Sequence, residues 1–454
     1  MKHSNIIQIN RRNFVKSSAA LAGGVILNPL PVSASAFVAG AETLKVALIG
    51  CGGRGTGAAA QALSVKEDVK LVAMADAFRD RLDESYDNLK KKFENSQRLD
   101  VPEEHKFVGF DAYKNAIELA DVVILTTPPG FRPIHFEAAV NAGKHVFMEK
   151  PVATDMPGVR QVLETAKKAK EKKLNVVVGL QRHYQKSYLE LMKRLHSGEI
   201  GDIVSGQVYW NSGGVWVHPR EAGQTEMEYQ MRNWYYFNWL CGDHILEQHI
   251  HNIDVANWAK NGYPVSAQGM GGREVRTGPE HGEIFDHHYV EFTYEDGSIV
   301  NSQCRHIKGC MDRVSESFVG TKGRATTDNR TEITDLKGNS IWRYREEKGG
   351  EANPYQVEHD ELFASIRNGG VITDAENGAY STMTAILGRM ATYSGKVITW
   401  DEAMKSDISL MPETFAWDAN PPVMPDENGN YPVPVPGQTE VVNAKTTEVK
   451  VGNE

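Results

Sequence analysis

A glycine-rich segment directly after an apolar run constrains the fold more than any other feature of this chain. Residues 44–49 are almost entirely apolar, as expected of a buried parallel strand. They lead into a G-x-G-x-x-G pattern and then into the helix-prone segment 58–63. In this pattern Gly50 permits a tight turn, Gly52 lets the backbone approach a pyrophosphate, and Gly55 lets the helix pack against the strand. The segment therefore predicts a dinucleotide-binding β–α unit.

An acidic residue ends the next expected strand. Residues 69–75 form a second apolar run that ends at Asp76, about 20 residues beyond Gly55, as the dinucleotide pattern requires. A carboxylate there accepts hydrogen bonds from the adenosine ribose hydroxyls and repels a 2′-phosphate. We therefore expect NAD as the cofactor and favour NADP less. Arg79, which follows closely, is the residue that would meet a 2′-phosphate if NADP were bound.

Strand and helix patterns continue to alternate through the first part of the chain. Further strands are expected over residues 121–127, 145–148 and 175–179, with helices over 136–142 and 156–171. This alternation predicts an α/β domain with a doubly wound parallel sheet of the Rossmann type, over residues 42–182. Ligands of such sheets collect at the carboxyl ends of the strands. The expected cofactor-binding residues are Gly50, Gly52, Gly53, Arg54, Gly55, Asp76, Thr127, Pro128, Glu149 and Lys150.

Lysine follows one of these strands at a chemically useful place. The apolar strand from His145 ends in Glu149-Lys150-Pro151. A lysine at a carboxyl strand end beside a nicotinamide can bind a substrate hydroxyl and stabilise the alkoxide that develops on it. We therefore predict a catalytic role for Lys150; the alternative is a surface lysine.

A later segment, residues 242–254, carries closely spaced ionisable residues. At helical spacing His244, Glu247, His251 and Asp254 fall on one face of an expected single helix. An imidazole exchanges a proton with a carbinol near neutral pH, so His251 is a candidate general acid/base, with Glu247 as its partner. We expect no resident metal. Two alternatives stay open: His244, Glu247 and His251 as ligands of a divalent metal, and a hydrogen-bonded polar interface.

Aromatic residues gather just before that segment. Trp234, Tyr235, Tyr236, Phe237 and Trp239 lie close together in the sequence. Aromatic faces beside hydrogen-bonding side chains suit a sugar ring, although such clusters are more often core. The candidate substrate-binding residues are Arg182, Tyr184, Trp234, Tyr236 and His244.

The glycine loop, the Glu149-Lys150-Pro151 tripeptide and the segment 240–254 together resemble the glucose–fructose oxidoreductase / inositol dehydrogenase / rhizopine-catabolism (Gfo/Idh/MocA) family. The resemblance covers residues 44–401. It implies that Lys150 lies at the nicotinamide and that an acidic residue and a histidine four apart complete the active site. Glu247 stands where the family more often has aspartate. The resemblance also implies a homo-oligomer.

After residue 182 the pattern changes to hairpin-like strands with glycine turns, such as Asp296-Gly297. We therefore expect a second, α+β domain over residues 183–416 with an open, mostly antiparallel sheet. Residues 417–454 are proline-rich and polar, and we expect them to run extended over the surface or to be disordered.

The first 36 residues are interpreted as an export signal. Arg11-Arg12 precedes a mildly apolar stretch and the small-residue pattern Ala34-Ser35-Ala36, which is similar to a twin-arginine signal. An ordinary secretion leader is the alternative. Both place the mature protein outside the cytoplasm, in the periplasm for the twin-arginine case. Because no free NAD pool is expected there, the cofactor should stay bound.

Charge and hydropathy exclude two classes of partner. The chain has 50 Lys plus Arg against 59 Asp plus Glu, a formal net charge of -9, which argues against a nucleic-acid binder with a broad basic face. No apolar run is long enough to cross a bilayer. The expected partner is a small-molecule sugar or glycoside.

Three functions follow from these features, in order of preference. The first is an NAD-dependent oxidoreductase acting on a secondary hydroxyl of a sugar or glycoside with tightly bound cofactor, for example forming a 3-keto-glycoside. The second is a redox-neutral, NAD-assisted glycosidase that works by transient oxidation and elimination. The third is a non-catalytic dinucleotide-binding sensor.

Overall fold

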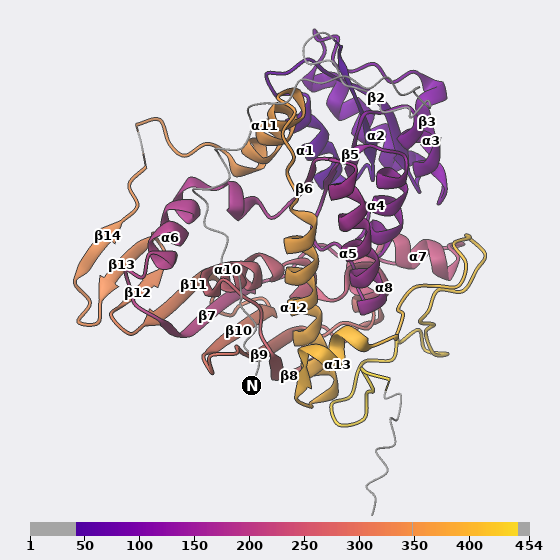
Figure 1. Cartoon of the computed structure of the whole chain (residues 1–454). Helices are drawn as coiled ribbons and strands as arrows, with labels where there is room; N and C mark the ends of the chain where they lie inside the picture. Colours follow the sequence, from indigo (N-terminus) through magenta and orange to yellow (C-terminus); the bar gives the residue numbers. More distant parts are fainter. Residues whose placement is uncertain (1–41, 347, 444–454) are drawn as a thin grey trace, which may run out of the picture. The chain divides into compact units, whose positions relative to one another are not determined.

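The computed structural model describes residues 42–346 and 348–443. Its first sheet is wholly parallel in the order β3-β2-β1-β4-β5-β6. Strands β2, β3, β5 and β6 of this sheet are labelled in Figure 1. The alternating pattern forces this arrangement, because each apolar strand is buried between helices on both faces. The strands are β1 (Leu44–Ile49), β2 (Val69–Asp76), β3 (Lys106–Val108), β4 (Val122–Leu125), β5 (His145–Met148) and β6 (Val176–Val178).

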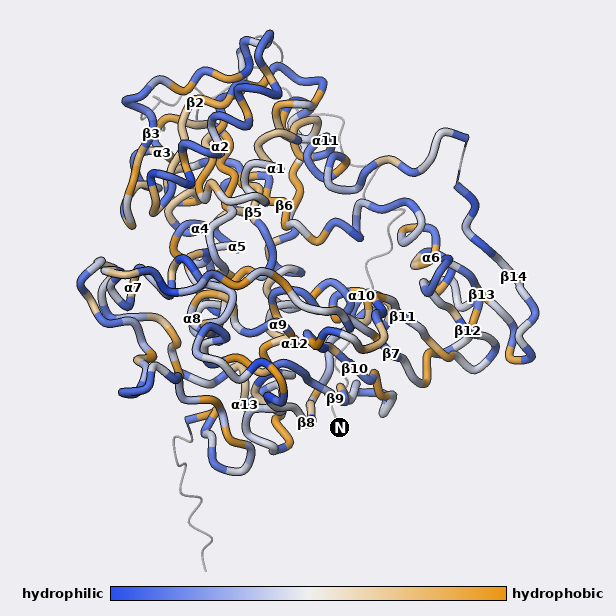
Figure 2. Tube along the Cα trace, turned by 180° about the vertical axis from the view of Figure 1, so that it is seen from behind, coloured by the Kyte–Doolittle hydropathy of each residue, from blue (hydrophilic) through white to orange (hydrophobic). Residues whose placement is uncertain are grey.

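The helices of this part connect successive strands. They are α1 (Gly53–Ala62), α2 (Arg79–Lys92), α3 (Ala112–Glu118), α4 (Arg132–Asn141) and α5 (Met156–Glu171). Most of α2 is hydrophilic (Figure 2), which agrees with a helix that is largely in contact with solvent. A distant helix, α11 (Pro354–Arg367), returns to pack against α1.

The second sheet has the order β14-β13-β12-β11-β7-β10-β9-β8-β15. All its pairs are antiparallel except β7 with β10, where Ile299 lies opposite Ser205. The expected α/β plus α+β architecture is therefore confirmed. The strands are β7 (Ile203–Ser212), β8 (Ser266–Gly272), β9 (His287–Thr293), β10 (Ile299–His306), β11 (Arg313–Gly320), β12 (Gly323–Thr326), β13 (Glu332–Asp335), β14 (Ser340–Arg343) and β15 (Ile398–Thr399).

The expected turn at Asp296-Gly297 joins β9 to β10. Gly297 has a φ of +78°, a conformation that glycine adopts without steric cost.

A long helix, α12 (Ala375–Ser394), is buried along most of its length and packs against β8, β9 and α5. Its Arg389 donates hydrogen bonds to the carbonyls of Gly242 and Thr154, so it links the first part of the chain to the segment that carries the candidate histidines. The remaining helices are α6 (Lys186–His196), α7 (Glu226–Arg232), α8 (Asn238–Cys241), α9 (His244–Glu247), α10 (Ile250–Lys260) and α13 (Trp400–Lys405), with short 3-10 turns that include η5 (Trp234–Tyr236).

The prediction of one helix over residues 242–254 was wrong. The chain forms α9 and α10 with a break at Gln248–His249, where the amides of both residues reach the carbonyl of His244. His249 contacts the Ser302 hydroxyl at 2.8 Å, a buried polar contact that a straight helix pattern does not encode. The Asp254 carboxylate contacts the ring of His183 and accepts a hydrogen bond from the hydroxyl of Ser381.

The C-terminal segment, defined here as the described residues 406–443, contains no helix or strand. It is nevertheless held at several points: Leu410 donates its amide to Asp155, and the buried Tyr431 donates its hydroxyl to Glu226. The predicted export signal lies outside the described residues. No helix in residues 42–346 or 348–443 combines the length and apolarity needed to cross a membrane. The described residues 42–346 and 348–443 belong to one compact unit, and the domain borders at 182–183 and 416–417 stay predictions.

Candidate functional site

The glycine loop between β1 and α1 has the geometry that the sequence pattern requires. Gly50 has a φ of +95°, and a Cβ there would lie 2.5 Å from the amide nitrogen of Thr127. A Cβ on Gly55 would lie 1.9 Å from the carbonyl oxygen of Gly50, whereas Cβ atoms on Gly52 and Gly53 would meet no atom of the described part of the chain within 4 Å. No side chain among the described residues caps the start of α1, so its first amides are available to an anion. The loop thus offers an open cradle for a pyrophosphate.

A cavity of about 570 Å³, here called the cofactor cavity, opens above this loop. One wall comes from the carboxyl ends of β1, β2 and β4, and the other from a later part of the chain. This volume lies within the range of small-molecule sites. The Rossmann wall includes Gly50, Gly52, Gly53, Arg54, Gly55, Asp76, Phe78, Arg81, Phe110, Thr127, Pro128 and His135, and the opposite wall includes Trp216, His218, Met231, Arg232 and Trp234.

Asp76 lines the cofactor cavity, and its carboxylate has acceptor sites that are not used among the described residues. Its two oxygens accept hydrogen bonds from the amides of Cys51 at 2.6 Å and Phe78 at 2.9 Å. Burial raises the pKa of this carboxyl, and these two amides oppose the shift. Each oxygen keeps a further acceptor site, which suits ribose hydroxyls.

The arginines around Asp76 differ from the sequence expectation. Arg79 pairs with Asp83 and Glu103 and does not line the cofactor cavity. Arg81 and Arg232 line it instead. The position of Arg81 follows from the register of α2, and that of Arg232 from a contact between parts distant in the sequence. The sequence therefore did not predict that either arginine lines this cavity, although Arg232 was considered as a neighbour of a sugar ring.

Arg54 and Glu149, both predicted to bind the cofactor, form an ion pair with 2.5 Å between Nε and Oε1. Arg54 also lies 3.8 Å from the buried Glu358 of α11. Burial raises the pKa of Glu358 well above its usual range, and the charge of Glu149 adds to this. A cation is thus held beside the pyrophosphate cradle by two carboxyl groups.

A buried arginine that sequence reasoning missed connects the cofactor cavity to the strand that carries Lys150. Arg132 donates to the carbonyl of Thr127 at 2.7 Å and to the carbonyl of Glu149 at 2.9 Å. These two carbonyls belong to the carboxyl ends of β4 and β5. Arg132 therefore fixes the position of Lys150 relative to the cavity wall.

The structure brings Lys150 and Glu247 together. The Lys150 ammonium donates to the main-chain carbonyl of Glu247 at 2.5 Å and to its Oε1 at 3.0 Å. Burial raises the pKa of Glu247, and the neighbouring Lys150 opposes the shift. The second oxygen, Oε2, is buried and has no hydrogen-bond partner among the described residues.

His251 lies in the first turn of α10, with its ring stacked on Trp210 at 6.0 Å between centroids. Burial lowers its pKa well below the usual value, and the positive charges of Lys150 and Arg182 act in the same direction. The imidazole is therefore neutral, and its buried Nδ1 has no partner among the described residues. A neutral ring of this kind can accept a proton.

Two predicted substrate-binding residues are engaged elsewhere. Arg182 forms a buried ion pair with Glu316, which also accepts from Tyr188, Thr327 and Asn252. Tyr184 donates its hydroxyl to Asp374 and belongs to the apolar cluster under β1. Neither residue lines the cofactor cavity.

The aromatic cluster divides into three roles. Trp234 lines the cofactor cavity. Tyr236 is fully buried, with its hydroxyl donating to the Trp216 carbonyl and accepting from Arg276. Tyr235, which sequence reasoning did not single out, has a buried hydroxyl without a partner among the described residues. Burial raises the pKa of Tyr235, and the charge of Glu247 adds to this. Tyr235 is thus a further candidate for contact with a sugar hydroxyl.

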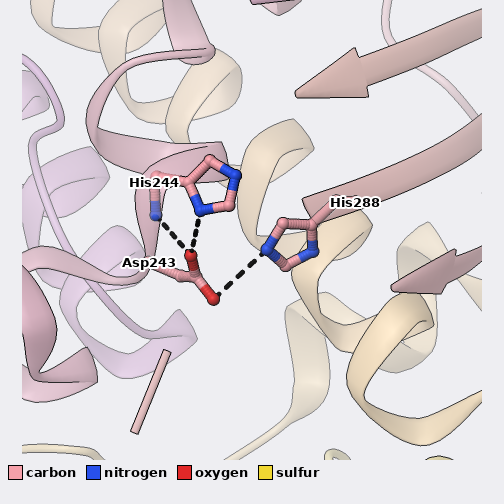
Figure 3. Close-up of side chains that lie close together, drawn as sticks. All are labelled: Asp243, His244 and His288. Carbon is pink, nitrogen blue, oxygen red and sulfur yellow. Dashed lines mark hydrogen bonds and ion pairs between the residues drawn. The ribbon is translucent and has the colours of Figure 1, made fainter. Parts of the chain in front are cut away.

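His244 contacts Asp243. Its Nδ1 is 2.8 Å from Asp243 Oδ1, and His288 of β9 approaches the same carboxylate (Figure 3). The structure therefore does not group His244 with Glu247 and His251, the set that the metal alternative required. All roles assigned to individual residues remain predictions.

Two domain models of one protein family match the chain. Residues 44–179 match "Oxidoreductase family, NAD-binding Rossmann fold", and residues 188–326 match "GFO/IDH/MocA C-terminal domain". Fold and cavity together define a two-part dinucleotide-binding protein of the oxidoreductase type. The chain belongs to the Gfo/Idh/MocA family, and the expected NAD-binding Rossmann domain is confirmed.

Curated relatives are similar over part of their length. An inositol 2-dehydrogenase from Serratia proteamaculans is 30% identical over 230 residues, covering 50% of this chain and 57% of the relative. A glycosyl hydrolase family 109 protein from Shewanella pealeana is 25% identical over 249 residues, covering 50% of each chain. The chain thus spans about half the length of the curated relatives that it matches.

Solved structures share the fold. The aldose-aldose oxidoreductase from Caulobacter crescentus superposes with a TM-score of 0.60 at 17% identity, covering 79% of this chain and 100% of that one. A levoglucosan dehydrogenase in complex with NADH and levoglucosan gives a TM-score of 0.61 at 15% identity, covering 79% and 99%. The expected homo-oligomer stays a prediction.

Proposed function

We propose that this protein is an NAD-dependent oxidoreductase acting on a secondary hydroxyl of a sugar or glycoside. The observation that carries the proposal is the buried Lys150–Glu247 pair, within electrostatic reach of a neutral His251 and tied through Arg132 to the cofactor cavity. These are the groups that oxidation of a carbinol needs: a cation for the oxygen and a base for the proton.

The open cradle at Gly52 and Gly53, the uncapped start of α1 and the free lone pairs of Asp76 fit NAD. When bound, NAD supplies the hydride acceptor. His251 takes the hydroxyl proton, because its depressed pKa keeps the ring unprotonated. Lys150 donates a hydrogen bond to the carbinol oxygen and stabilises the negative charge that develops on it, while Glu247 holds the ammonium in place.

The cofactor cavity has features that favour tight retention of the dinucleotide. Its adenosine end is covered by Arg232, which pairs with Asp80 and lies 4.0 Å above the ring of Phe78. The C-terminal segment adds Trp417, whose ring centroid lies 4.5 Å from that of Phe110 and 5.0 Å from that of Phe78. Because both phenylalanines line the cavity, release of NAD would require these contacts to loosen.

Retention is what an exported enzyme needs, and we propose that the protein is exported with its cofactor. The support is the Arg11-Arg12 motif of the sequence. Fractionation of cells that express the full chain tests it: the protein should appear outside the cytoplasm, and Arg11→Lys with Arg12→Lys should keep it inside. Export that is unchanged in the double variant would favour the ordinary secretion route.

A second candidate is the redox-neutral glycosidase, favoured by the similarity to glycosyl hydrolase family 109 proteins. Here oxidation of a sugar hydroxyl acidifies the neighbouring C–H bond, and loss of that proton expels the aglycone. Water then adds to the double bond, and return of the hydride restores the sugar. The same Lys150 and His251 would serve both reactions, because both begin by oxidising a carbinol.

One experiment separates the candidates. Purified protein is incubated with an aryl glycoside without added NAD, and both aglycone and keto-sugar are measured. Multiple turnovers of aglycone without keto-sugar favour the glycosidase, whereas keto-glycoside that accumulates with an electron acceptor supports the oxidoreductase. If protein that carries NAD forms neither product, the non-catalytic dinucleotide-binding sensor would be the better interpretation.

A further inference from the structure

Three side chains of types that can bind a metal ion meet in the interior. Asp243 immediately precedes α9, His244 is the first residue of that helix, and His288 lies on β9. Their side chains are fully buried. One donor atom from each lies within 4.8 Å of the other two, the only such group among the described residues (Figure 3).

Hydrogen bonding to Thr392 fixes which nitrogen of His288 carries the proton. The Thr392 hydroxyl donates to the carbonyl of Arg389 at 3.0 Å, and Gly388 offers a second carbonyl at 3.2 Å. Its oxygen therefore accepts from His288 Nδ1, which is 2.9 Å away. In a neutral ring this leaves Nε2 with a lone pair. That nitrogen is buried, lies 3.2 Å from Asp243 Oδ2 and has no partner of good hydrogen-bond geometry among the described residues.

The Asp243 carboxylate is held from outside the cluster. Oδ2 accepts from the Phe285 amide at 3.0 Å and from the Tyr393 hydroxyl at 2.5 Å, and Oδ1 accepts from the His244 amide at 2.5 Å. A carboxylate has about four acceptor sites, so one on Oδ1 remains, facing His244 Nδ1 at 2.8 Å. A cation can take the place of the proton between these two atoms.

We propose that Asp243, His244 and His288 bind a divalent transition-metal ion. Two imidazole nitrogens and a carboxylate oxygen are ligands typical of zinc. Thr392, Phe285 and Tyr393 supply the outer hydrogen bonds that orient such ligands. The ion joins the start of α9 to β9 and so fixes the helix that carries Glu247. The proposed role is structural, independent of the proposed reaction, and it replaces the expectation that no metal is resident.

The test uses the full chain, purified without a metal-affinity column and analysed by inductively coupled plasma mass spectrometry. We expect about one equivalent of zinc per chain after gel filtration. His288→Ala should lose it. His287→Ala, which changes the adjacent and partly exposed histidine, should retain it, as should Cys310→Ser, which removes the exposed thiol. Equal metal content in the His287 and His288 variants would overturn the proposal.

Two further measurements need no variant of the cluster. A strong chelator should lower the melting temperature of the wild-type chain, and added zinc chloride should restore it. X-ray absorption at the zinc edge should show nitrogen and oxygen ligands at about 2.0 to 2.2 Å and no sulfur. Wild-type protein that contains no metal and gains no thermal stability from zinc would instead mean a buried Asp243–His288 ion pair only.

Discussion

Lys150 donates to Glu247 twice, to the main-chain carbonyl at 2.5 Å and to the carboxylate at 3.0 Å. This pair connects the carboxyl end of β5 with the last residue of α9, two elements almost a hundred residues apart. Because the first contact is made to the main chain of residue 247, it positions the Lys150 ammonium whether the side chain at 247 is glutamate or aspartate. The longer side chain of glutamate, compared with the aspartate expected from the family, is therefore compatible with a well-placed lysine.

Lys150→Ala should reduce turnover of a sugar substrate by about 100-fold or more, the usual contribution of a group that acts on the reacting proton or charge. NAD should remain bound, because Lys150 is not among the residues that line the cofactor cavity. Turnover and the absorbance of released dinucleotide measure the two effects. Lys90→Ala on the exposed face of α2 is the control, and equal turnover in both variants would remove Lys150 from the mechanism.

The pH dependence of kcat/KM should reflect the neutral state of His251. Because burial and Lys150 lower its pKa well below the usual value, the base stays competent as pH falls through 6.5, and activity should decline only at lower pH. His251→Asn should abolish this acidic limb together with most of the turnover. An acidic limb centred near 6.5 would contradict the assignment.

Acid should destabilise the fold from about pH 6.5 downward. Burial lowers the pKa of His249 and of His359 to about 3. Both rings are therefore neutral when folded but take up protons when unfolded, so stability present above pH 6.5 is lost toward pH 3. Each contributes a slope of about 1.4 kcal/mol per pH unit to the free energy of unfolding. Urea titrations between pH 7 and 5 measure the slope, which His359→Gln should reduce by one such contribution.

Two glycines of the phosphate loop should respond differently to alanine. Gly55→Ala places a Cβ 1.9 Å from the Gly50 carbonyl, so we expect a large fall in melting temperature. The Cβ of Gly52→Ala meets no atom of residues 42–346 or 348–443 within 4 Å, so the fold should persist while NAD binding weakens. Thermal unfolding and dinucleotide content distinguish these outcomes, and a stable Gly55→Ala variant would contradict the packing described here.

Trp417→Ala should allow bound NAD to dissociate from the protein. Its loss uncovers Phe78 and Phe110 beside the cofactor cavity. Dialysis followed by measurement of bound NAD should show loss from this variant, while Val435→Ala, an exposed position of the same C-terminal segment, behaves as wild type. Equal retention would assign tight binding to the Rossmann part alone.

Much of the fold follows from local patterns in the sequence. The apolar strands, the Gly50–Gly55 loop and the turn at Gly297 depend on burial and on backbone angles that few residues adopt. These requirements act over a few residues, so the sequence displays them directly. The same holds for Lys150, whose place at a carboxyl strand end follows from the strand alone.

Contacts between distant segments decided the rest. The break at His249, the grouping of His244 with His288, the bridge made by Arg132 and the approach of Trp417 to Phe110 all join parts far apart in the chain or depend on a buried polar partner. Helical spacing put His244 and His251 on one face, but the free energy of satisfying buried polar groups outweighs helix regularity. The sequence alone thus determined the architecture and the dinucleotide loop, and the tertiary structure decided which ionisable groups meet.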